Sequence, residues 1–360
     1  MKLGLIARAD NTGLGMQTWE FYRAMKPDKT LVVDISAMNG NKQYPERYPD
    51  ATFVKIPTDG DIREFLQGLD VVFLAEAEYN PHLYIIAKQM GVKVANQYNY
   101  EFFTWLVVKD LPAPDMFIAP SHWNYDKVQA YCDQHNIKHV YLHCPVNREA
   151  IPFREIDEAR TFLHVAGRSA AMDRNGTESV IQASKFVKSG AKIVIHFQGQ
   201  QGLSHQATRT IDEYREYLQQ YGNPDIVTIQ EKEFDNYADV YKEGDVMLLP
   251  RRYGGNCLPL NEALSAGMPV LMPDISPNNT FLPEQWLIPA DKIGEFAPRT
   301  TIDIYGVNPY LLAGEIDKLY YSREGEFKTH NRLADAVAQT ISWENMKPQY
   351  LKAFEELCNQ

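Results

Sequence analysis

The sequence predicts an α/β protein made of two Rossmann-like domains that face each other across a cleft. Short, continuous apolar runs alternate with helical patterns along most of the chain, which is typical of parallel strands buried on both faces. The alternation is interrupted once, at the polar segment 145–157 with its two prolines, and then restarts. At 360 residues the chain also exceeds the size at which one hydrophobic core keeps growing. Two domains therefore fit both the pattern and the length.

The first domain is expected to span residues 1–148. It begins with a strand over 2–7, a loop over 8–15 and a helix that runs to Met25. Apolar runs mark further strands at 30–34, 52–56, 71–74, 92–96, 116–119 and 140–142. Helical patterns lie between most of these strands, as a doubly wound parallel sheet requires.

The second domain is expected to span residues 149–340. Its predicted strands are 161–166, 192–197, 226–230, 245–250 and 270–272. Helices are expected at 176–187, 208–221, 236–243 and 259–266, and after an irregular segment up to residue 306 also at 309–321 and 332–340. A last helix, 344–358, lies in the terminal segment 341–360, which we expect to cross back onto the first domain.

Residues 251–270 contain the most informative local pattern. A Gly-Gly turn follows the strand 245–250, and a helix that begins near Pro259 ends at Gly267. A glycine loop that leads into a helix at the carboxyl end of a parallel strand presents free N–H groups and the positive end of the helix dipole. The pattern therefore predicts a site for a phosphate or another anion. Its candidate residues are Gly254, Gly255, Asn256, Cys257 and Leu258.

Composition narrows the classes of function. The net charge of −11 argues against a broad basic surface for nucleic acid, although it does not exclude a local basic cleft. No stretch approaches the about 20 apolar residues that span a bilayer, so no stable membrane insertion is expected. The four cysteines show no metal-ligand spacing, which predicts reduced thiols in a cytoplasmic protein without a bound metal.

Four segments in order resemble one known family. Residues 165–168 (VAGR), 173–176 (DRNG), 237–241 (YADVY) and 258–270 (LPLNEALSAGMPV) are similar to the nucleotide-binding domain of GT-B glycosyltransferases, and most similar to the retaining family 4. The resemblance covers most of 115–290. It implies transfer of a sugar from a nucleotide-diphosphate sugar to an acceptor hydroxyl, with retention and without a metal. No cofactor is implied beyond that nucleotide sugar, which serves as co-substrate.

The resemblance assigns roles to three charged residues. Arg168 follows a strand end, where a guanidinium grips diphosphate oxygens, and its alternative is an ion pair with Asp173. Arg174 is the expected second cation, although the family places a Lys one residue later, where this chain has Asn175. Glu262 matches the second Glu of the family's Glu-x7-Glu motif and would accept both ribose hydroxyls. Its alternative is a first-turn acid that complements the helix dipole.

Three glycines bear on the donor. The first Glu of the motif is replaced by Gly254, which leaves open a pentose donor, a hexose held by Asn256 and backbone N–H groups, or an inactive fold. In the first domain, Gly13 and Gly15 match the family's glycine-rich first loop, which closes over the donor. These glycines also resemble a dinucleotide fingerprint, but Thr18 stands where the third glycine belongs, so NAD is the poorer interpretation.

The acceptor is expected at residues 96–105, an aromatic segment without the family's usual His. Asn99 or Glu101 would polarise the acceptor hydroxyl, and Tyr98, Tyr100 and Trp105 would stack on the acceptor or, equally, pack under a loop. A saccharide or a lipid-linked sugar is the commonest acceptor in the family, and some viral members modify a hydroxylated DNA base. A sugar-nucleotide epimerase and a non-catalytic nucleotide-sugar sensor are the rival functions.

Overall fold

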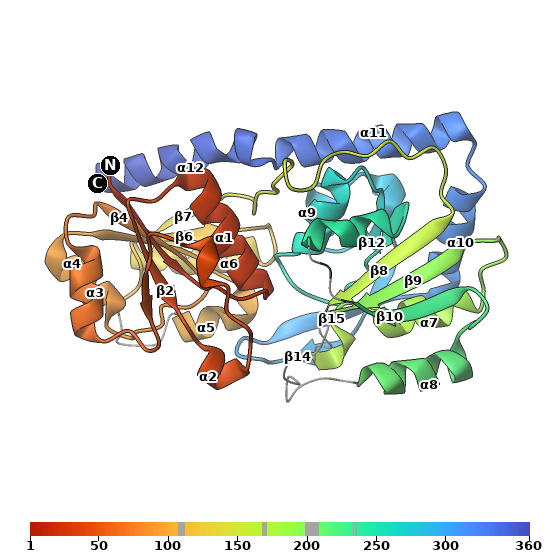
Figure 1. Ribbon diagram of the computed structural model, residues 1–360, viewed down its shortest axis with the longest axis horizontal. Coiled ribbons are helices and arrows are strands. Elements are labelled where there is room, and N and C mark those ends of the chain that lie inside the picture. The colour runs from red at the N-terminus through yellow and green to blue at the C-terminus, as the bar shows by residue number, and fades with distance from the viewer. Residues whose placement is uncertain (107–111, 168–170, 199–208, 233, 235) are drawn as a thin grey trace. The chain divides into compact units, whose positions relative to one another are not determined.

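The computed structural model describes residues 1–106, 112–167, 171–198, 209–232, 234 and 236–360 (Figure 1). The chain forms two compact units. The first contains Met1–Cys144, Pro298–Thr300 and Trp343–Gln360, and the second contains Pro145–Ala297 and Thr301–Ser342. The first unit thus includes the last helix, and also three residues from the middle of the second half of the chain.

The first unit is built on a parallel sheet in the order β3-β2-β1-β4-β5-β6-β7. These strands are β1 (Leu3–Ala7), β2 (Lys29–Val33), β3 (Thr52–Val54), β4 (Val71–Ala75), β5 (Lys93–Gln97), β6 (Met116–Ala119) and β7 (Lys138–Tyr141). The order reverses between β1 and β4, and open parallel sheets typically bind ligands at such a reversal, at the carboxyl ends of the strands.

Helices cover both faces of this sheet, which is why its strands are apolar at successive positions. Leu5 and Phe73 pack with α1 (Gly13–Met25) and α12 (Trp343–Cys358), whereas the adjacent residues Ile6 and Leu74 pack with α3 (Asp59–Leu66) and α4 (Leu83–Met90) (Figure 1). The rings of Phe21 and Phe73 stack at 4.0 Å in the first of these layers. The remaining short elements are α2 (Ser36–Asn39), η1 (Pro45–Arg47), η2 (Tyr100–Phe102), α5 (Phe103–Leu106) and α6 (Tyr125–His135).

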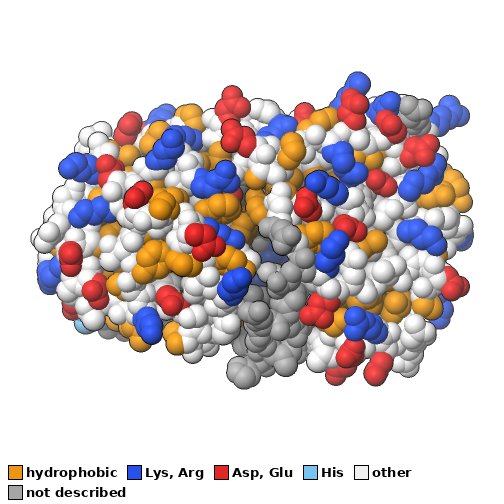
Figure 2. Space-filling model, in the orientation of Figure 1, with side chains coloured by type: hydrophobic (Ala, Val, Ile, Leu, Met, Phe, Trp, Pro, Cys, Tyr) orange, Lys and Arg blue, Asp and Glu red, His pale blue; other side chains and the backbone are white. Residues whose placement is uncertain are grey.

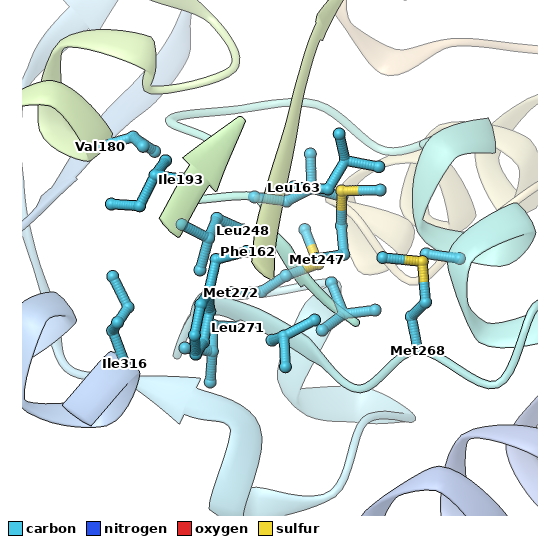
Figure 3. Close-up of a cluster of buried hydrophobic side chains, with 14 of the residues drawn as sticks. Phe162, Leu163, Val180, Ile193, Met247, Leu248, Met268, Leu271, Met272 and Ile316 are labelled. Carbon is cyan, nitrogen blue, oxygen red and sulfur yellow. The ribbon is translucent and has the colours of Figure 1, made fainter. Parts of the chain in front are cut away.

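The second unit repeats this arrangement with a parallel sheet in the order β10-β9-β8-β11-β12-β13. Its strands are β8 (Thr161–Gly167), β9 (Lys192–Phe197), β10 (Val227–Glu231), β11 (Val246–Leu248), β12 (Val270–Pro273) and β13 (Leu287–Ile288). Its α-helices are α7 (Thr177–Ser184), α8 (Ile211–Tyr221), α9 (Leu258–Ser265), α10 (Pro309–Tyr320) and α11 (Glu324–Thr340). Figure 3 shows its core, where Phe162, Leu248 and Leu271 from neighbouring strands lie close to Ile316 of α10.

Three segments differ from the sequence-based expectation. The helix expected at 332–340 begins eight residues earlier, as α11 (Glu324–Thr340). Residues 236–243, expected as an α-helix, form the 3₁₀ helix η4 (Tyr237–Lys242), whose first turn is capped by the Asn236 side chain. The segment up to residue 306 is expected to be irregular. It contains two 3₁₀ turns, η5 (Asn278–Thr280) and η6 (Glu284–Trp286), and an antiparallel hairpin of β14 (Ala290–Phe296) and β15 (Ile302–Val307). In β15, buried Ile302 and Ile304 flank exposed Asp303, which is the period-two pattern of a half-buried strand.

The surface is mixed in charge. On the face drawn in Figure 2, Lys and Arg side chains are interspersed with Asp and Glu among the described residues. None of the helices within the described ranges is both long and apolar enough to cross a bilayer. A further short turn, η3 (Ala171–Asp173), precedes α7 and belongs to the site described next.

Candidate functional site

The candidate site lies at the carboxyl ends of β8 and β11 in the second unit. These two strands are neighbours, with Val246 opposite Phe162 and Met247 opposite Leu163. The chain order of the sheet reverses between them, so the loops that follow both strands leave the same edge of the sheet. We call residues 171–176 the first loop and residues 250–257 the second loop.

Arg252 ties the two loops together. Its backbone N–H donates to the Arg174 carbonyl at 2.8 Å, and its Nη1 donates to the Met172 carbonyl at 3.2 Å. Gly176 has a φ of +75° and lies so close to the second loop that a Cβ there would be 2.1 Å from the Pro250 carbonyl oxygen. A residue with a side chain would therefore separate the loops, and the backbone of Arg174 is fixed on both sides.

Two guanidinium groups converge on Gly254. A Cβ on this residue would lie 2.5 Å from Nη2 of Arg251 and 2.7 Å from Nη2 of Arg174. The φ of Gly254 is +120°, a conformation that residues with a side chain rarely adopt. Glycine is thus required here both by the backbone and by the space that the two arginines occupy. Positive charge stands where the resembling family has a carboxylate.

The surrounding loop holds both guanidinium groups in place. Arg251 is 7% exposed and donates from Nε to the Tyr253 carbonyl at 3.0 Å and from Nη1 to the Asn256 carbonyl at 2.7 Å. The guanidinium carbon of Arg174 lies 5.2 Å from the centre of the Tyr253 ring, a cation–π distance. Preorganised guanidinium groups suit the oxygens of a diphosphate. Arg251 was not among the sequence candidates, and its only signal was the Arg-Arg pair directly after a strand.

Glu262 lies in the second turn of α9 and accepts a hydrogen bond from the Tyr241 hydroxyl. Burial, followed by the charge of Glu262, holds the pKa of Tyr241 well above its ordinary value, so this hydroxyl stays a proton donor. The alternative role as a first-turn acid does not apply, because α9 has no acidic residue in its first turn. Gly255, Asn256, Cys257 and Leu258 are half-buried where the second loop enters α9.

The first loop is organised by Asp173 and Asn175. Asp173 accepts hydrogen bonds from the N–H groups of Thr177 and Glu178 at 2.9 and 3.0 Å and so caps α7. Burial raises the pKa of Asp173 to about 6, although Arg252 is only 3.4 Å away. The Asn175 amide donates to the Ala166 carbonyl at 2.7 Å, which anchors the loop to the end of β8. Arg168 lies outside the described residues.

The glycine-rich loop of the first unit is arranged differently. A Cβ on buried Gly15 would lie 2.1 Å from the Asp10 carbonyl oxygen, so the close approach of the loop to α1 explains this glycine. Gly13 is the exposed first residue of α1. The Asp10 carboxylate is fully buried and forms an ion pair with Arg8. Its burial acts to raise its pKa, but Arg8 and hydrogen bonds from Thr12 outweigh burial and hold the pKa below its ordinary value.

The aromatic residues expected at the acceptor lie mostly in a core cluster of the first unit. Tyr98 is 2% exposed, its hydroxyl lies 3.1 Å from Nε2 of His139, and its ring contacts Phe103 and Phe117. Tyr100 is also buried, with its ring nearly parallel to that of Phe103. These contacts favour the packing alternative for both tyrosines. The Trp105 side chain lies outside the described residues.

Asn99 and Glu101 flank this cluster and are both buried. The Asn99 Oδ1 atom has no hydrogen-bond partner among the described residues. Leaving a buried acceptor unsatisfied costs about 1–3 kcal/mol, so such an atom is suited to receive a hydrogen bond from a ligand hydroxyl or a water. The Glu101 carbonyl accepts a hydrogen bond from the Thr300 N–H at 3.0 Å. Thr300, at the tip of the β14–β15 hairpin, thus holds the segment that carries Asn99 and Glu101.

Within the described residues, no three His, Cys, Asp or Glu side chains are grouped to hold a metal ion.

No family model matches the chain, and no curated protein does. Solved structures do match over nearly the whole chain. Sucrose-phosphate synthase from Thermosynechococcus elongatus shares 14% identity, with 99% of both chains covered and a TM-score of 0.71. Anabaena HepE in complex with UDP and glucose shares 10% identity, with 99% of this chain and 100% of that chain covered and a TM-score of 0.70.

A glycosyltransferase from Rickettsia africae is a third match, at 12% identity and a TM-score of 0.67, with 99% of this chain and 98% of that chain covered. The three likenesses agree with the two doubly wound parallel sheets described above. They confirm the fold class predicted from the sequence, the GT-B architecture of two Rossmann-like domains. At this level of identity they establish the fold, and the activity has to be argued from the site.

Proposed function

We propose that this protein is a glycosyltransferase that moves a sugar from a nucleotide-diphosphate sugar to an acceptor hydroxyl. The observation that carries the proposal is the convergence of Arg174 and Arg251 on Gly254, directly before the start of α9. Two fixed guanidinium groups match the forked oxygens of a diphosphate. Structures of the same fold in complex with UDP and with UDP-glucose support a nucleotide-sugar donor.

The proposed chemistry follows from where charge develops. When the bond between the sugar and the β-phosphate breaks, negative charge builds on that phosphate. Arg174, Arg251 and the backbone N–H groups of Gly255–Leu258 would stabilise it, together with Arg168, without a metal. Retention, as in glycosyltransferase family 4, is part of this proposal, with the departing phosphate accepting the proton of the acceptor hydroxyl.

The remaining roles are assigned by side-chain chemistry. Glu262, oriented by Tyr241, would accept the ribose hydroxyls. The Asn99 Oδ1 atom would accept a hydrogen bond from the acceptor hydroxyl, and Glu101 would lie beside it in the same segment. With no carboxylate at position 254, the donor sugar would be held by Asn256 and backbone N–H groups, as a hexose or a pentose. The proposed acceptor is a saccharide.

The test is a panel of nucleotide sugars incubated with the protein, with released nucleoside diphosphate and sugar products measured. We expect slow hydrolysis of one donor and faster release when a suitable acceptor is added. Interconversion of two nucleotide sugars would instead identify an epimerase, and binding without turnover would identify a sensor. Adding oligonucleotides that contain hydroxymethylated bases separates a DNA acceptor from a saccharide.

Replacing Arg174 with Ala tests the site itself. Because the Arg174 backbone is held by Arg252, the variant should fold, while kcat/KM for the donor should fall about 100-fold or more. Arg215→Ala is the matched control, since Arg215 pairs with Asp212 on the exposed face of α8. Wild-type turnover in Arg174→Ala would remove the proposed role of this residue.

A further inference from the structure

The hairpin β14–β15 has an unusual division between the two units. Its arms belong to the second unit, but Pro298–Thr300, at the tip, belong to the first. Thr300 is 8% exposed, whereas the next residue, Thr301, is exposed. A threonine that is buried at the tip of a loop needs partners for its hydroxyl and its backbone groups.

Those partners are all in the segment that carries Asn99 and Glu101. The Thr300 N–H donates to the Glu101 carbonyl at 3.0 Å, and the Thr300 hydroxyl oxygen accepts from the Thr104 N–H at 3.1 Å. The Thr104 hydroxyl in turn donates to the Arg299 carbonyl at 3.1 Å. The tip therefore holds both ends of residues 101–104 through backbone groups, which fixes the position of the segment as well as its contacts.

The arms of the same hairpin contact the second loop of the candidate site. The Tyr305 N–H of β15 donates to the Arg252 carbonyl at 3.0 Å. The ring of Phe296, the last residue of β14, lies 5.8 Å from the ring of Tyr253, which itself lies against the Arg174 guanidinium. Within the second unit, the hairpin arms thus support the loop proposed to bind the donor.

We propose that Thr300 is a positioning residue that holds the 99–104 segment, and with it the proposed acceptor-binding residue Asn99, in place. It acts through Glu101 and Thr104 and does not itself touch substrate. This inference rests on the proposed function, and it adds a residue that contributes to the rate of the chemical step and not to donor affinity.

The test compares Thr300→Val, Thr300→Ser and Thr301→Val in the full-length protein. Valine has the shape of threonine but lacks the hydroxyl that accepts from the Thr104 N–H, serine keeps it, and Thr301→Val makes the same chemical change at the exposed neighbour. Hydrogen exchange of peptides within 99–104 should become about tenfold faster in Thr300→Val alone, because the hydrogen bonds of the Thr300 hydroxyl with the Thr104 N–H and the Thr104 hydroxyl are lost. Thr300→Ser should restore the protection. Equal exchange in Thr300→Val and Thr301→Val would overturn the tether.

Kinetics separate positioning from a general structural role. With UDP-glucose, or the nucleotide sugar that the panel selects, Thr300→Val should lower kcat about tenfold and leave KM for the donor unchanged. A raised KM together with a lower melting temperature would show a structural role only and would overturn the inference. If the wild-type protein consumes no nucleotide sugar at all, the proposed function fails, whatever the exchange data show about the tether.

Discussion

The two units share a strand order but differ in the loops that follow their first strands. Counted from the outer strand, both sheets run third, second, first, fourth, with the reversal next to β1 in one and next to β8 in the other. After β1 the loop buries a carboxylate, Asp10, against Arg8. After β8 and β11 the loops bring Arg174 and Arg251 to the bare α-carbon of Gly254.

This difference shows how one topology yields two kinds of loop. In each unit the loops leave the sheet at the point where the strand order reverses, which is where open parallel sheets typically bind ligands. The charges in the loops then decide what binds there. In the first unit the charge of Arg8 is matched by Asp10 within the loop, and the glycine at position 15 serves close packing. In the second unit, the glycine at position 254 leaves room for two cations.

The largest effect is expected when a carboxylate is placed in the second loop. Gly254→Glu would restore the acidic residue of the resembling family, but between two guanidinium groups that would then pair with it. We expect affinity for UDP to fall about 100-fold or more, because an intramolecular anion competes with the diphosphate. Isothermal titration with UDP measures this effect.

Gly254→Gln is the matched control for shape and for backbone strain. Both variants force a side chain onto a residue with a φ of +120°, so both should lose stability to a similar extent. Only the Glu variant adds a charge. An equal loss of UDP affinity in the two variants would mean that space, and not the pair of cations, makes this loop a binding site.

The loop after β1, which holds Arg8 and Asp10, should respond in stability instead of binding. Asp10→Asn leaves the half-buried Arg8 without its charged partner and should lower the free energy of unfolding by about 2–3 kcal/mol. Because the folded-state pKa of Asp10 is lowered, its stabilising contribution is present above its ordinary pKa and is lost as the pH falls through the lowered value. The variant should therefore lack this part of the acid-induced loss of stability.

Denaturant unfolding of the wild-type protein and of Asp10→Asn, measured between pH 2 and pH 7, checks the expected change in stability. UDP affinity should change less than twofold in Asp10→Asn, since the two guanidinium groups are in the other unit. A drop in affinity as large as that of Gly254→Glu would show that the loop after β1 binds the nucleotide as well as the second loop does. The contrast between the units would then not hold.

Much of the fold followed from the sequence because parallel strands covered on both faces leave continuous apolar runs. The predicted strand 192–197 coincides with β9, and the helix 309–321 with α10 to within one residue. The hairpin β14–β15 was missed because β14 is polar and mostly exposed, so it carries little hydrophobic signal. The 3₁₀ helix η4 was predicted as an α-helix, since apolar spacing does not separate the two over six residues.

The site was only partly predictable for a different reason. The sequence singled out positions 254 and 262, because glycine loops and helix starts leave a local pattern. It could not show that Arg174 and Arg251 meet at Gly254, since they are 77 positions apart and the contact depends on how two loops pack. For the same reason no local pattern singles out Thr300, whose partners lie near residue 100.

The smallest expected effect concerns the nucleoside end of the proposed donor. Glu262→Gln keeps the size of the side chain but replaces the carboxylate that accepts from the Tyr241 hydroxyl. If Glu262 binds the ribose hydroxyls, affinity for UDP should fall about tenfold, because charge-assisted hydrogen bonds become neutral ones. Affinity for pyrophosphate, which has no ribose, should not change. Tyr241→Phe keeps the carboxylate and should weaken UDP less than Glu262→Gln does, and a parallel loss of pyrophosphate affinity would place Glu262 in support of the second loop and not at the ribose.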